Sequence, residues 1–226
     1  MKTEDWKAIE TAKALVIGHD PRLQKSDTIA AFALFADYFF RVKPTSPSEM
    51  RKYGLAKATF DQITDITNGN IIPKIMYVTN LCNYPLPRTP DKTVLITIDK
   101  AKAGLENIKN ILLNNPTIDY IFPMSMQVNY WLQKLGFYSS NNDFLVLSEP
   151  REVGLLSNPP YYKPIQQKTF TLICGNIYTV TDGYQKVIPI LHVKNYPLKG
   201  NFLEAYGLLY DHIRKYFKDH CFPDKV

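Results

Sequence analysis

Three polar residues of the chain follow three separate apolar runs, and their side chains are of types that bind or activate substrates. Asp20 comes just after the first run, Asn80 ends the second and His192 ends the third. In open α/β sheets, ligands bind in the crevice beyond the carboxyl ends of the strands. If each run is a buried strand, a carboxylate, an amide and an imidazole meet at one edge of the sheet. We therefore expect a pocket for a small polar heterocycle there.

The apolar runs have the length and composition of buried strands. Short runs rich in Val and Ile, bounded by turn residues, are typical of parallel strands covered on both faces. The strands predicted in this way cover residues 14–17, 75–79, 118–122, 169–174 and 187–191.

Longer segments with helical spacing of apolar residues lie between these strands. A helix is expected where such a segment follows a capping residue and stops at Gly, Asn or Pro. The predicted helices cover residues 3–12, 28–40, 49–67, 100–113, 126–135 and 203–217. Alternating strands and helices indicate a three-layer α/β/α fold with a central, mainly parallel twisted sheet. The chain has 226 residues, so we expect residues 1–226 to form one domain.

The composition indicates which kind of partner and which cellular compartment to expect. The chain has 27 basic and 21 acidic residues, for a net charge of +6, which favours an anionic partner such as DNA. Its three cysteines are scattered without metal-ligand spacing, so no zinc or iron–sulfur site is expected. No signal peptide and no membrane-length apolar run is found. We expect a cytoplasmic monomer that binds no membrane.

The order of three short motifs, with an Arg-Thr-Pro loop after the second, resembles the uracil-DNA glycosylase superfamily. A strand is followed by Gly-His-Asp-Pro at 18–21, and a second strand ends in Tyr-Val-Thr-Asn at 77–80. Arg-Thr-Pro follows at 88–90, and a late strand leads into Leu-His-Val-Lys-Asn-Tyr-Pro-Leu at 191–198. This resemblance implies the α/β/α fold of the superfamily and hydrolysis of the N-glycosidic bond of a deaminated or damaged base in DNA. It also implies that no metal or cofactor is needed.

The resemblance gives roles to the three polar residues. Bond cleavage develops positive charge on the sugar and negative charge on the departing base. Asp20 would stabilise the sugar cation and orient a water, and His192 would donate a hydrogen bond to the anionic base. The Asn80 amide offers both a donor and an acceptor to the edge of the base.

Further residues receive roles in binding. The base pocket would include His19, Arg22 and a stacking ring from Phe32 or Phe35. A base inside a duplex must be flipped out, and Tyr196 or Leu198 would wedge into the gap that it leaves. Basic residues near the motifs would contact phosphates. They are Lys25, Arg88, Lys194 and Lys199.

Several positions depart from the pattern of the superfamily. His19 replaces the usual Gln, Arg22 stands where a Tyr excludes the thymine methyl group, and Val193-Lys194 replaces Pro-Ser. Two alternatives therefore stay open, a nucleic-acid or nucleotide-binding module without catalysis and a hydrolase of free nucleosides. Each residue also has a structural alternative, because the Phe side chains can fill the core, and Tyr196 and Leu198 can anchor a loop.

Overall fold

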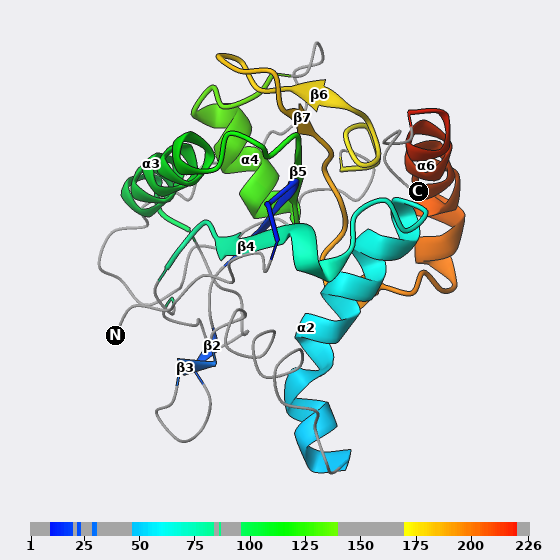
Figure 1. Cartoon of the computed structure of the whole chain (residues 1–226). Helices are drawn as coiled ribbons and strands as arrows, with labels where there is room; N and C mark the ends of the chain where they lie inside the picture. The colour runs from blue at the N-terminus through cyan, green and yellow to red at the C-terminus, as the bar shows by residue number, and fades with distance from the viewer. Residues whose placement is uncertain are drawn as a thin grey trace, which may run out of the picture.

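The structure of the chain, a computed structural model, describes residues 10–19, 22–23, 29–30, 47–83, 86, 96–139 and 170–220. For residues 22–23, 29–30 and 47–56 it describes the backbone only. A five-stranded sheet in the order β4-β1-β5-β7-β6 lies between helices (Figure 1). The strands are β1 (Ala14–Gly18), β4 (Met76–Asn80), β5 (Tyr120–Pro123), β6 (Tyr178–Thr179) and β7 (Lys186–Val187).

The sheet is mostly parallel. β1 pairs in parallel with β4 and β5, and β5 pairs in parallel with β7, whereas β6 runs antiparallel to β7. Every residue of β1 and β4 is buried. Burial on both faces explains why these two strands are continuous apolar runs and not alternating ones.

Helices cover both faces of the sheet. The helices are α2 (Pro47–Ile66), α3 (Ile98–Asn114), α4 (Met126–Lys134) and α6 (Asn201–Asp219). Ala14 and Val16 of β1 share a core cluster with side chains of α2 and α6. Leu15 and Ile17 point to the other face and share a cluster with α3 and α4. The predicted α/β class with a mostly parallel sheet is confirmed.

The four predicted helices that fall on described residues are confirmed within a few residues. α2 ends at Ile66, and Asn68 and Gly69 just after it have positive φ angles of 50° and 73°. Gly136, with φ 73°, follows the end of α4. These left-handed positions stop a helix because they turn the backbone out of its path. None of the described helices is long and apolar enough to cross a membrane.

Three predicted elements are wrong where the structure describes them, and a fourth, the strand predicted over 187–191, is shorter, since β7 ends at Val187 and Ile190 forms an isolated bridge. The helix predicted over 28–40 includes Ile29–Ala30, which form β3 and pair antiparallel with β2 (Arg22–Leu23). The helix predicted over 3–12 does not include residues 10–12, because Glu10 N–H bonds to the carbonyl of Lys74 instead. The rest of both predicted helices lies outside the described residues.

The third wrong element is the strand predicted over 169–174. Residues 170–171 are helical and a turn follows, with Cys174 N–H bonded to Phe170 O at 2.8 Å. Phe170, Ile173 and Cys174 are buried, while Leu172 is 55% exposed. This is the spacing of a helical turn rather than the alternation of a strand.

Candidate functional site at the carboxyl edge of the sheet

The carboxyl ends of the parallel strands meet at one edge of the sheet, which we call the carboxyl edge. At this edge Gly18 of β1 lies opposite Asn80 of β4 in the register. The chain after β7 continues beside β5, with a parallel bridge between Met124 and Ile190, and then reaches His192. The structure therefore brings His19, Asn80 and His192 to the same edge.

The width of this site follows from the strand order. β1 and β5 lie between β4 and β7. Neighbouring strands are about 4.8 Å apart, so the ends that carry Asn80 and His192 are roughly 14 Å apart at the backbone. A single ligand can contact both side chains only if it fills most of that width, as a base hydrogen-bonded at two opposite edges does.

The Asn80 side chain is fixed at the end of β4. Only 6% of its surface is exposed, and its Oδ1 lies too close to the position of a β-carbon on Gly18 for both to fit. Leu81 N–H then bonds to Gly18 O at 2.9 Å. The Leu81 carbonyl in turn packs against Gly104 of α3, closer than any side chain at position 104 would permit. Two glycines thus make room for the segment that presents the Asn80 amide.

His192 caps a short 3₁₀ helix, η2 (Val193–Asn195). Its Nδ1 accepts a hydrogen bond from Lys194 N–H at 3.1 Å. Because this bond uses the lone pair of Nδ1, the neutral ring carries its proton on Nε2. A neutral imidazole in this tautomer is a hydrogen-bond donor through Nε2.

Ser125 is a residue of this edge that the sequence patterns did not single out. It follows β5, and its N–H bonds to Ile190 O at 3.2 Å. Its φ of 85° and ψ of 156° lie in a region that is essentially limited to glycine. Such strain costs about 1–3 kcal/mol and is often found at functional sites. A Ser that caps α4 directly after an apolar run was the available signal in the sequence.

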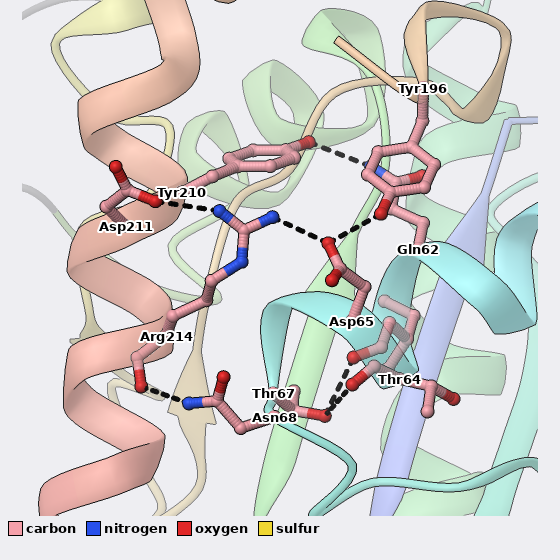
Figure 2. Close-up of polar contacts among 10 residues, drawn as sticks. Gln62, Thr64, Asp65, Thr67, Asn68, Tyr196, Tyr210, Asp211 and Arg214 are labelled. Carbon is pink, nitrogen blue, oxygen red and sulfur yellow. Dashed lines mark hydrogen bonds and ion pairs between the residues drawn. The ribbon is translucent and has the colours of Figure 1, made fainter.

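Tyr196, one of the two predicted wedges, has contacts within the protein. Its hydroxyl donates to Asp65 Oδ2 at 2.5 Å, and Arg214 Nη2 donates to the same oxygen at 2.6 Å (Figure 2). The Tyr196 ring and Leu198 pack against the core cluster of α2 and α6. These are the contacts of the alternative role as loop anchors, and the wedge role stays a prediction. Lys194 and Lys199, on either side of them, are exposed.

Other predicted site residues lie partly or wholly outside the described residues. Arg22 is described by its backbone alone, in β2. Five residues lie outside the described residues, namely Asp20, Lys25, Phe32, Phe35 and Arg88.

The described cysteines and acidic residues form no metal centre. Cys82 and Cys174 are buried thiols, and burial raises the pKa of Cys174 far above its ordinary value despite a hydrogen bond with the Leu191 backbone. Within the described part of the chain, no three His, Cys, Asp or Glu side chains gather as a metal site would require.

Two cavities within the described residues lie away from the carboxyl edge. One, of about 740 Å³, is lined by Tyr77, Asn107 and the chain on either side of Pro116. The other, of about 570 Å³, lies between the end of α3 and the turn around Gly183. Both adjoin segments that enter strands, so they are at the opposite, amino edge of the sheet.

Comparison with protein-family models and with curated proteins gives no relative. No protein-family model matches the chain, and no curated protein is similar enough to count as a homologue. The resemblance to the uracil-DNA glycosylase superfamily is therefore carried by the short motifs alone.

Proposed function

We propose that the protein is a DNA glycosylase with a fold like that of uracil-DNA glycosylases, which hydrolyses the N-glycosidic bond of a deaminated or damaged base. The observation that supports this most is the common edge of His19, Asn80 and His192: His19 follows β1, Asn80 ends β4 in register with Gly18, and His192 follows the bridge that Ile190 makes with Met124. The chemistry that each side chain offers is what bond cleavage requires.

The proposed reaction divides between the two sides of the scissile bond. The C1′–N bond breaks, its electron pair leaves with the base, and a water adds to the sugar. Asp20, two residues beyond Gly18, would stabilise the positive sugar and orient that water. His192 would donate its Nε2 proton in a hydrogen bond to the negative base, and Asn80 would bind the base edge. All of this uses the protein's own side chains, without metal or cofactor.

The charge of the chain fits a DNA partner. The net charge is +6, and the exposed side chains of Lys194 and Lys199 lie in the segment that follows His192. Phosphates of single- or double-stranded DNA bound across the carboxyl edge would meet these lysines. We propose a cytoplasmic enzyme that acts as a monomer.

A binding module without catalysis is the second candidate. The departures at His19, Arg22 and Val193-Lys194 favour it, because they change residues beside the proposed catalytic groups. A hydrolase of free nucleosides is the third, since the same groups would cleave the same bond.

An oligonucleotide panel separates these functions. Labelled single and double strands would carry uracil, hypoxanthine, xanthine or a mismatch, and alkali would cleave the strand at any abasic site. A glycosylase leaves abasic sites with at least one of these bases. Binding without cleavage would instead support the module, and release of base from free nucleosides alone would support the small-molecule enzyme.

A further inference from the structure

The backbone of Leu191, directly before His192, is bonded to side chains of two helices. Leu191 N–H donates to the Tyr210 hydroxyl of α6 at 3.2 Å. Gln62 of α2 donates through Nε2 to Leu191 O at 3.2 Å and to the same Tyr210 hydroxyl at 2.8 Å. Figure 2 shows Gln62 and Tyr210 facing each other between the two helices. We call these two side chains the Leu191 clamp.

The clamp takes the place of a strand neighbour. Ile190 still pairs with the β5 chain, through Ile190 N–H to Pro123 O and Ser125 N–H to Ile190 O. After Ser125 the β5 chain turns into α4, so the sheet offers no ladder partner one residue later. Leu191 is only 5% exposed, and buried backbone groups need partners. The side chains of Gln62 and Tyr210 supply them, and the Cys174 thiol also has a hydrogen bond with the Leu191 backbone.

Gln62 satisfies the buried Leu191 carbonyl at a cost to its own side chain. Its side chain is fully buried, and its Oε1 has no hydrogen-bond partner among the described residues. An unsatisfied buried acceptor costs about 1–3 kcal/mol, the same range as leaving the Leu191 carbonyl without a donor. Gln62 fixes the orientation of its neighbours, because its two N–H groups donate to the Leu191 carbonyl and to the Tyr210 hydroxyl.

A second tether holds the far end of the same segment. Tyr196 is bonded to Asp65, which Arg214 also contacts. Asp65 lies one turn after Gln62 on α2, and Arg214 lies one turn after Tyr210 on α6. The same two helices therefore hold the chain before and after η2. The second tether is partly exposed, so solvent weakens it, and the buried clamp is the more rigid of the two.

We propose that Gln62 and Tyr210 are positioning residues that hold the His192 imidazole, through the backbone of Leu191, in the orientation that the site requires. The inference rests on the proposed function for what His192 does, but not for how it is held. An error of about 1 Å in such a group can lower a rate by up to roughly 100-fold.

The test uses two variants of the full-length protein and one control. Gln62→Met keeps the shape but removes both donors, and Tyr210→Phe removes the hydroxyl. Tyr138→Phe is the control, because it also removes a buried hydroxyl bond, that to Asn129 at 2.6 Å, but in the core cluster of the other face. The first readout is the ¹⁵N spectrum of the His192 ring, which needs no substrate. The second is single-turnover base release together with Kd for DNA.

We expect both clamp variants to change the His192 ring from a single Nε2–H tautomer to a mixture. Base release should fall roughly 10- to 100-fold with Kd for DNA within about twofold, and Tyr138→Phe should change neither. An unchanged His192 spectrum in either folded clamp variant would overturn the inference, whatever the activity. If the ring responds but the wild type releases no base, the positioning role stands and the glycosylase proposal fails.

Discussion

The side-chain oxygen of Asn80 lies 2.3 Å from the position that a β-carbon on Gly18 would occupy, too close for both to fit. The two residues are paired across β4 and β1, at the last position of each strand. The site therefore needs a residue without a side chain at position 18, because any side chain there would displace the Asn80 amide, which is proposed to bind the base. This contact links the Gly-x-Asp-Pro motif of the first strand to the Asn motif of the second.

Gly18→Ala should therefore displace the Asn80 amide. We expect a loss of about 1–3 kcal/mol in the free energy of unfolding, as for other overpacked sites, and weaker binding of base-containing ligands. Chemical denaturation and binding titrations measure the two effects. Gly207→Ala in α6 is the matched control, since its β-carbon meets only ordinary contact and Ala stabilises a helix. Equal behaviour of the two variants would show that the close approach at Gly18 is unimportant.

The tether at Asp65 should make part of the stability depend on pH. Burial tends to raise the pKa of Asp65, but hydrogen bonds from Tyr196 and Arg214 and the Arg214 charge outweigh it and lower the pKa below its ordinary value of 3.8. A carboxyl whose pKa is lower in the folded than in the unfolded protein stabilises the fold at pH values above its unfolded pKa. This stabilisation is lost as the pH falls through the folded pKa. Asp65→Asn should thus be less stable than the wild type at neutral pH, by about 1 kcal/mol or less, and the gap should close well below pH 3.8.

Denaturation of both proteins from pH 7 to about pH 2 tests this linkage. Asp61→Asn removes the same charge from the same helix, but Asp61 forms its ion pair with Lys57 one turn away and not with Arg214. That control should show a smaller gap. A gap for Asp65→Asn that is constant over the whole pH range would exclude the ion pair as its cause.

Apolar runs predicted β1, β4 and β5 from the sequence, and packing decided the elements that the runs did not predict. The runs of β1 and β4 contain their own signal, because parallel strands buried on both faces must be apolar throughout. In contrast, Phe170 and its neighbours have residue types that favour strands but are helical, since Phe170, Ile173 and Cys174 are buried together. No local pattern shows that Gln62 meets Leu191, because the two are 129 positions apart in the chain.

The lysines beside His192 should bind phosphate. Replacing Lys194 and Lys199 by Ala should make the DNA-binding constant less dependent on salt. The slope of its logarithm against the logarithm of salt concentration should fall by about one unit for each phosphate that is no longer neutralised. Lys13 and Lys74, which pair with Asp119 and Glu10 at the amino edge, are the matched control pair. If both double variants behave alike, the DNA surface lies elsewhere.

Arg22 should broaden the choice of base. It stands where the resembling enzymes have a Tyr that excludes the thymine methyl group, and a long charged side chain is a poorer steric gate and a better donor. We expect the wild type to release bases other than uracil, such as deaminated purines. Arg22→Tyr should release fewer of the other bases and retain activity on uracil. Strict uracil specificity in both the wild type and Arg22→Ala would refute this role.

The most direct test of the account is the single-turnover rate of base release by the wild type and Asp20→Asn, measured beside their Kd for the same DNA. The carboxylate matters most when charge develops on the sugar, so its loss should act on the rate and not on binding. We predict that Asp20→Asn releases base at least about 100-fold more slowly, with Kd within about twofold. Equal rates for the two proteins, or no base release by the wild type from any oligonucleotide of the panel, would contradict the glycosylase account.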